Sequence, residues 1–171
     1  MIGARRRRVT TISRYTSGLV DAKLRELIIY LCERRITARS FGTSQLNTLL
    51  CLSDFLHYRR HGESITGADY VVAEHGPWLV KFELYLDPLL DDGSIVIQPS
   101  DLGGYTQYRP MALASADLFG FNGAEIASAE QILRATEGQS ASELGDLAHS
   151  LTHWRDGDLG SPLPYDLAVG D

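Results

Sequence analysis

Two pairs of histidines are the residues of this sequence whose types and spacing could do chemistry. His57 and His61 lie four residues apart, and so do His149 and His153. Residues four apart on a helix share one face, so each pair could present two imidazoles to a metal ion. Asp54, three residues before His57, could orient its ring. A metal-dependent hydrolase that uses both pairs is therefore one hypothesis for this chain.

The residues around these pairs argue against that hypothesis. The paired histidines are separated by YRR and by SLT, so the glutamate base of a zincin helix is absent. The sequence has no Gly-x-Ser-x-Gly motif, and the DLGGYTQ stretch lacks the lysine and the following helix of a phosphate-binding loop. We therefore interpret the histidines as surface or packing residues. The sequence predicts a protein that is not an enzyme and that has no metal and no cofactor.

The charge of the chain is unevenly distributed. The formal net charge is −6, and removing the four positive charges of Arg5–Arg8 leaves −10 for the remainder. A body this acidic repels phosphate backbones, so nucleic-acid binding is expected only through the Arg5–Arg8 segment. The same charge can attract a basic protein. A regulator that uses the basic segment on DNA stays a weaker alternative.

Compartment and cysteine usage point the same way. No apolar run approaches the roughly 20 residues that span a bilayer, and no apolar segment of a secretory signal follows Arg5–Arg8. Cys32 and Cys51 both lie on predicted helix faces and are interpreted as small buried hydrophobic residues without a disulfide. We expect a cytoplasmic protein that does not contact a membrane.

Two amino-terminal segments have helical periodicity. Apolar residues from Leu19 onward predict an amphipathic helix of about 16 residues. A second helix is predicted to begin at a cap formed by Thr43 or Ser44 and to end at Gly62. Because this second helix is apolar around most of its circumference, we expect it at the centre of the fold.

The middle of the chain has the composition of strands. The segment ADYVVAE is rich in β-branched and aromatic residues, and Gly76-Pro77 is expected to end it and to start a helix over WLVKFELYLDPLLDDG. Two runs at residues 94–98 and 105–109 flank a Gly-Gly turn and predict a hairpin. We expect this hairpin and the Tyr70 strand to form one small antiparallel sheet.

Two capping boxes introduce the last helices. Asn122 with Glu125, and Ser140 with Glu143, have the residue types and spacing of such boxes. The fold class that follows is mainly α with a small antiparallel β-sheet or hairpin (α+β), in a single compact helical domain over residues 18–167. Residues 1–17 lack periodicity and are predicted to be a flexible basic tail.

A set of less common residues falls in a recognisable order. A leucine-rich helix ends in an acidic-aromatic-x-His pattern. It is followed by a glycine, an Ile-Thr-Gly turn, an aromatic strand and a Gly-Pro; a later helix carries a histidine with a tryptophan five residues on, before PLPYD. This order resembles the SocA-like antitoxin (Panacea) domain family, formerly a phage-associated domain of unknown function. The positions that carry the resemblance include Asp54, His57, Gly67, Gly76, Pro77, His149 and Trp154.

The resemblance implies a non-enzymatic role. Such domains occur beside many unrelated toxins in bacteria and phages, where they serve in toxin-antitoxin systems and phage defence. They neutralise a cognate protein toxin by direct binding, and in the SocA type by delivering it as an adaptor to an ATP-dependent protease.

The stretch from Gly62 to Trp78 has two interpretations. Gly67 and Gly76-Pro77 are expected to be corners that fix the strand between its neighbours. The residues beside these corners could instead form an acidic and aromatic patch that contacts the toxin, because aromatic side chains supply contact area at a low entropy cost. The predicted partner-binding residues are Asp69, Tyr70, Glu74, His75 and Trp78.

Overall fold

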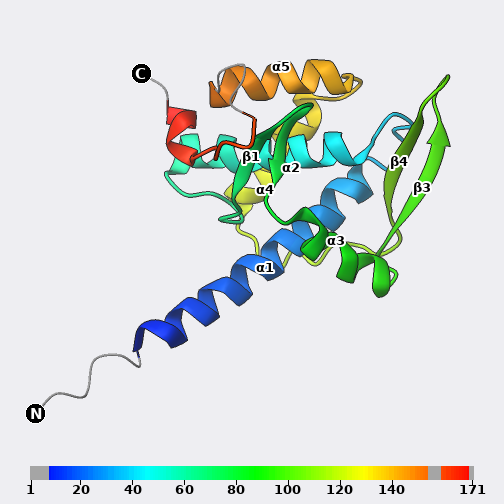
Figure 1. The fold of residues 1–171 in the computed structure, drawn as a ribbon. Coiled ribbons are helices and arrows are strands. Elements are labelled where there is room, and N and C mark those ends of the chain that lie inside the picture. The colour runs from blue at the N-terminus through cyan, green and yellow to red at the C-terminus, as the bar shows by residue number, and fades with distance from the viewer. Residues whose placement is uncertain (1–7, 154–158, 170–171) are drawn as a thin grey trace, which may run out of the picture.

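The computed structural model describes residues 8–153 and 159–169, which form a mainly helical α+β fold (Figure 1). The predicted fold class is thus confirmed. Along the chain the elements are α1 (Arg8–Arg34), α2 (Thr43–His61), β1 (Tyr70–Ala73), β2 (Gly76–Leu79), α3 (Phe82–Asp91), β3 (Ile95–Asp101), β4 (Thr106–Ala112), α4 (Gly123–Ala135), α5 (Ala141–Thr152) and the short 3-10 helix η1 (Tyr165–Val169).

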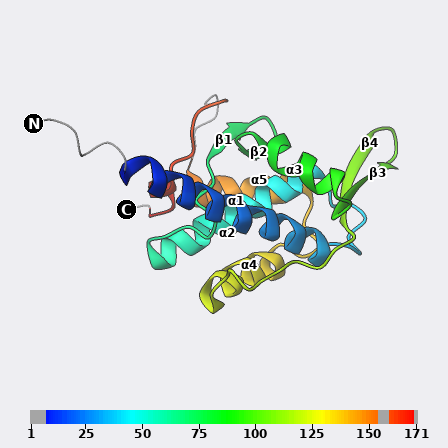
Figure 2. The same ribbon diagram turned by 90° about the horizontal axis from the view of Figure 1, so that it is seen from below.

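Helix α2 lies at the centre, as its apolar circumference predicts. It crosses the middle of the molecule between α5 and α1 in Figure 1, and α4 and the β1–β2 hairpin lie on opposite sides of it in Figure 2. It ends at Gly62, whose φ of 76° gives the left-handed C-cap that was predicted. Its N-cap is Gly42, so the prediction of Thr43 or Ser44 was wrong. The Gln45 side chain reaches back to accept a hydrogen bond from the Gly42 N–H at 3.3 Å.

Helix α1 begins earlier than predicted, at Arg8 instead of Leu19. Its amino-terminal part extends beyond the rest of the molecule in both views (Figures 1 and 2). Residues 8–17 contain no proline, and adding a residue to an existing helix costs far less than nucleating one, so the helix continues without apolar periodicity. Residues 1–7, which include most of the predicted basic arm, lie outside the described residues.

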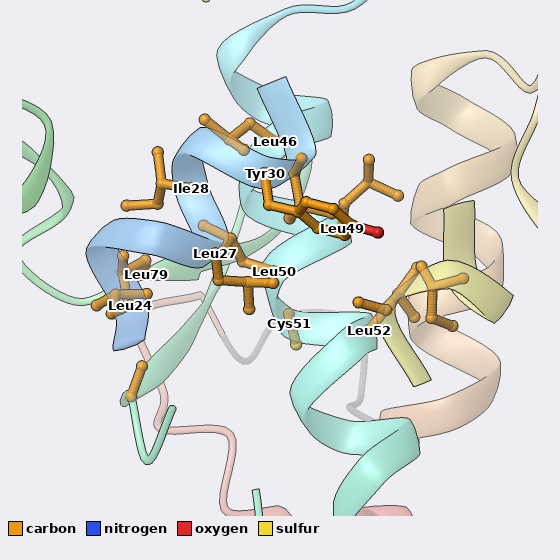
Figure 3. Close-up of a cluster of buried hydrophobic side chains, with 14 of the residues drawn as sticks. Leu24, Leu27, Ile28, Tyr30, Leu46, Leu49, Leu50, Cys51, Leu52 and Leu79 are labelled. Carbon is orange, nitrogen blue, oxygen red and sulfur yellow. The ribbon is translucent and has the colours of Figure 1, made fainter. Parts of the chain in front are cut away.

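The main core forms where α1 meets α2. Leu24, Leu27 and Ile28 of α1 are at most 1% exposed and pack against buried leucines of α2 (Figure 3). Burial of each such side chain contributes about 1.5–3 kcal/mol. Cys32 and Cys51 are buried and unbridged, as predicted. This packing fixes α2 as the frame on which the later segments are arranged.

Strands β1 and β2 form an antiparallel hairpin, which corrects the prediction that Gly76-Pro77 begins a helix. Pro77 pairs with Val72. The Val72 N–H donates to Ser161 O at 2.9 Å, and its carbonyl accepts from the Gly160 N–H at 2.8 Å. Val72 therefore directs its backbone groups away from β2, and the N–H that proline lacks is not needed in this pair. The following helix, α3, starts only at Phe82.

Strands β3 and β4 form the predicted hairpin but make a separate two-stranded sheet, so the expectation of one shared sheet was wrong. Pro99 pairs with Tyr108, and Pro110 pairs with Ile97. Hydrogen-bonded and non-hydrogen-bonded residue pairs alternate along an antiparallel ladder. Because the Leu113 N–H donates to Ser94 O, both prolines lie in non-hydrogen-bonded pairs. Each proline thus removes an outward N–H from an edge of the ribbon, which limits pairing with further strands.

Helices α4 and α5 begin at the two predicted capping boxes. Asn122 Oδ1 accepts from the Glu125 N–H at 2.9 Å, and Glu125 Oε2 accepts from the Asn122 N–H at 2.9 Å. Ser140 and Glu143 bond in the same reciprocal way. Glu125 also forms an ion pair of 2.6 Å with Lys23 of α1. The cap of α4 therefore fixes this helix against α1.

We expect Asn122→Ala to lower the free energy of unfolding by about 1 kcal/mol, because it leaves the Glu125 N–H without its acceptor. Urea denaturation measures the change. Asn122→Asp is the matched control, since aspartate caps as well as asparagine. Equal losses in the two variants would contradict this assignment of the cap.

Candidate functional site

A buried carboxylate organises the family-motif residues. Asp54 of α2 is fully buried and accepts three hydrogen bonds: from the Thr66 N–H at 2.8 Å, from Thr66 Oγ1 at 2.6 Å and from the Tyr70 hydroxyl at 2.7 Å. Burial raises the pKa of the Asp54 carboxyl, while the bonds from Thr66 and Tyr70 oppose that rise. Asp54 thereby ties α2 to the Ile-Thr-Gly turn and to the start of β1.

The carboxyl-terminal segment covers the same region. The Tyr165 hydroxyl donates to Ala68 O at 2.5 Å, and its ring lies 4.9 Å from the Phe55 ring. The Leu163 N–H donates to Tyr70 O at 2.8 Å. The PLPYD segment therefore contacts both β1 and α2 and holds the strand against the helix.

His57 is a packing residue, and Asp54 does not orient it. Its Nδ1 lies 3.0 Å from Ser128 Oγ of α4, and its side chain belongs to the buried set. Burial lowers the pKa of His57, and the nearby His61 imidazole, with ring centroids 4.5 Å apart, lowers it further. The sequence spacing suggested Asp54 as the partner of His57, but the Asp54 carboxylate accepts its hydrogen bonds from Thr66 and Tyr70.

This environment predicts a pH dependence of stability. Because the pKa of His57 in the folded chain is below its ordinary 6.5, the unfolded chain binds the extra proton below pH 6.5. The stabilisation is therefore present above pH 6.5 and is lost as the pH falls toward the folded pKa. In urea denaturation at a series of pH values, His57→Asn is expected to reduce this loss. An unchanged pH dependence of stability in His57→Asn would contradict the assignment.

The two histidine pairs do not build a metal site. His57 contacts α4, whereas His149 lies on α5 and lines a separate cleft. His153 is the C-cap of α5, with a φ of 49°. In the described ranges, which include all four of these histidines, no group of three or more histidine, cysteine, aspartate or glutamate side chains could hold a metal ion. The four-imidazole arrangement behind the hydrolase hypothesis is thus not formed.

A surface cleft of about 960 Å³ lies between segments that are far apart in the sequence. Its walls are the first turn of α2, the turn between β1 and β2, the tip of the β3–β4 hairpin and the first half of α5. The start of α2, the β1–β2 turn, the start of α5 and the tip of the β3–β4 hairpin lie toward the upper right of Figure 1. Its lining includes Gly42, Glu74, His75, Gly76, Tyr105, Gln107, Tyr108, Asp146 and His149.

The predicted partner-binding residues divide into two groups. Asp69, Glu74 and His75 are exposed, and the last two line the cleft. Tyr70 is only 2% exposed, so its prediction as a surface residue was wrong: its ring packs beside Phe55 and its hydroxyl is held by Asp54. Trp78 is half-buried, with its ring edge-on to Phe82.

The remaining motif residues are corners of the fold or lie outside the described ranges. Gly67 and Gly76 have positive φ values of 70° and 119°, as expected for corners, and Pro77 is buried in β2. Trp154 lies outside the described residues. Sequence analysis missed Tyr105 and Tyr108, which are 62% and 57% exposed. The signal for them was two tyrosines that closely follow the Gly-Gly turn of the hairpin, next to the polar residues Thr106 and Gln107.

These features define a helix-rich α+β domain in which a buried carboxylate joins the central helix to the first hairpin. A separate polar and aromatic cleft lies on its surface. Residues 46–155, nearly two thirds of the chain, match the family model described as antitoxin SocA-like, Panacea domain. The chain therefore belongs to the SocA-like antitoxin (Panacea) domain family, and the family suggests a role in a toxin-antitoxin system. Comparisons with curated proteins and with solved structures gave no match.

Proposed function

We propose that this protein is a cytoplasmic antitoxin that neutralises its cognate protein toxin by direct binding. The observation that carries the proposal is the family match over residues 46–155, which contains Asp54, His57, Gly67 and His149. The acidic charge of the chain supports a protein partner over nucleic acid. No helix in the described part of the chain is long and apolar enough to cross a membrane.

We propose further that the toxin contacts the side of the molecule formed by the β1–β2 hairpin and its flanks. Asp69, Glu74 and His75 are exposed there, and Trp78 is half-buried. Tyr70 is buried beneath this surface, and its hydrogen bond to Asp54 fixes the start of β1 to α2. A hairpin held on both sides binds with little ordering cost, which favours it as a contact surface.

Growth rescue tests the proposal. The genes adjacent to the one that encodes this protein are each expressed alone, and one of them is expected to stop growth. Expression of that gene together with this protein is expected to restore growth. Both chains should co-purify. Failure to rescue, with the protein present in normal amounts, would overturn the proposal.

Two modes of neutralisation give different results in the same strains. Sequestration leaves the toxin intact in a stable complex, whereas an adaptor shortens its half-life in a manner that requires an ATP-dependent protease. We propose direct binding as the basic step, because both modes require it. The toxin half-life, measured after synthesis is blocked, distinguishes them.

Metal analysis tests the hydrolase alternative. The purified protein is expected to contain no stoichiometric zinc or manganese, and added zinc is expected to leave its melting temperature unchanged. The physical reason is that His57 is engaged with Ser128 and away from the cleft that His149 lines. One equivalent of bound metal that is lost in His57→Asn or His149→Asn would favour the enzyme instead.

A further inference from the structure

The cleft beside the β1–β2 turn has a definite charge. Glu74 and Asp146 are exposed residues of its lining, from the hairpin turn and from α5, and none of the described residues that line it is a lysine or an arginine. The first turn of α2 also opens there, but a helix amino terminus carries only about half a positive charge. Two full carboxylate charges outweigh that partial charge, so the cleft favours a cationic occupant.

The rim of the cleft adds aromatic surface that is held in place. Tyr105 and Tyr108 extend from the β3–β4 tip and are more than half exposed. The ribbon behind them is fixed to the α1–α2 loop, because Gln107 Nε2 donates to Ser40 O and Arg109 donates to Ala38 O. Exposed tyrosines on a fixed support provide contact area, and their faces attract lysine and arginine side chains.

Hydrogen-bonding groups in the cleft suit a peptide backbone. Gln107 Oε1 has no hydrogen-bond partner among the described residues, but it is buried, so it can accept a bond from a bound donor only when the Gln107 side chain shifts toward the cleft. Gly42, as the N-cap of α2, has no side chain to cap the first N–H groups of that helix. Those N–H groups can donate to carbonyl oxygens of an incoming chain.

From these observations we infer that the cleft receives a positively charged, extended segment of the toxin. Lysine or arginine side chains of that segment meet Glu74 and Asp146, and its backbone lies between the tyrosine rim and the β1–β2 turn. This inference rests on the proposed antitoxin function and adds to it the chemistry of the contact. It also places Tyr105 and Tyr108 in the interface, which the sequence motif does not.

Binding measurements with the purified cognate toxin test the inference. Four double variants are compared with the wild-type chain by titration calorimetry and by binding kinetics. Two alter the cleft, Tyr105→Ala with Tyr108→Ala and Glu74→Gln with Asp146→Asn. Two are matched controls on exposed positions outside it, Phe119→Ala with Leu113→Ala and Glu83→Gln with Asp87→Asn. Thermal melting confirms that each variant is folded.

The tyrosine variant is expected to raise the Kd by about 30-fold, as for two interface residues whose truncation together costs about 2 kcal/mol. The carboxylate variant is expected to slow association, and its difference from wild type should shrink when the ionic strength rises from about 0.05 to about 0.5 M. Both controls should bind as wild type does.

The failures of the two proposals are distinguishable. If the wild-type chain does not bind the toxin, the antitoxin function itself fails. If it binds, and both cleft variants bind equally well with the same salt dependence, only the inference about the cleft is overturned. If the tyrosine variant does not fold, the carboxylate variant and its salt dependence decide the question, because both charges are exposed.

Discussion

Replacing Asp54 by alanine is expected to lower the free energy of unfolding by about 3–5 kcal/mol. The change leaves the Thr66 N–H, the Thr66 hydroxyl and the Tyr70 hydroxyl without their shared acceptor in a buried site. Each unpaired buried donor costs about 1–3 kcal/mol. Urea denaturation monitored by circular dichroism measures the loss.

A graded series separates the hydrogen bonds from simple truncation. Asp54→Asn keeps the shape and one acceptor oxygen, so its loss should be smaller than that of the alanine variant. Tyr70→Phe removes one of the three donors and should cost about 1 kcal/mol. Glu63→Ala, at an exposed position near the turn, is the control with no expected change. Similar stability of Asp54→Ala and Glu63→Ala would show that the network does not hold the fold.

The role of Asp54 illustrates what the sequence could and could not predict. Its place on a central, largely buried helix followed from the apolar residues around it, and the structure confirms that helix. Its partners did not follow. Spacing along one helix suggested His57, but the actual donors come from Thr66 and Tyr70, which reach Asp54 only after the chain turns back at Gly62.

Pro77 shows the same limit at the level of secondary structure. A proline after glycine is a good local signal for the first turn of a helix. It lies in a strand here because its partner Val72 bonds to Gly160 and Ser161 instead of to β2. That exchange joins segments almost ninety residues apart, so no local pattern contains it. Local capping signals, by contrast, correctly marked α4 and α5, since both partners of each box lie within one turn.

The candidate site was predictable only in part for a related reason. Glu74 and His75 were selected because they flank a corner of the chain, and both line the cleft. Tyr105 and Tyr108 join them only because the β3–β4 ribbon is anchored to the α1–α2 loop. The sequence shows aromatic residues close to a hairpin turn, but it does not show which other elements line the cleft with them.

Gly76→Ala is the second change for which we expect a large effect, a loss of about 2–3 kcal/mol in the free energy of unfolding. The φ of Gly76 is 119°, which is costly for any residue with a Cβ atom, by about 1–3 kcal/mol. An added Cβ would also lie 3.3 Å from Thr48 Oγ1 of α2, closer than ordinary contact. The hairpin turn that carries Glu74 and His75 would then have to move away from α2.

Gly104→Ala is a matched control for backbone strain. Its φ is 114°, nearly the same, but an added Cβ would meet nothing within 4 Å. The difference between the two variants therefore measures the close approach of β2 to α2. Adding Thr48→Ala to Gly76→Ala should recover part of the loss, because it removes the atom that the new Cβ would meet, and neighbouring sites of this kind couple by about 0.5–3 kcal/mol. Equal losses for Gly76→Ala and Gly104→Ala, with no recovery in the double variant, would mean that backbone strain alone accounts for the glycine, and that α2 does not fix the position of the hairpin at the cleft.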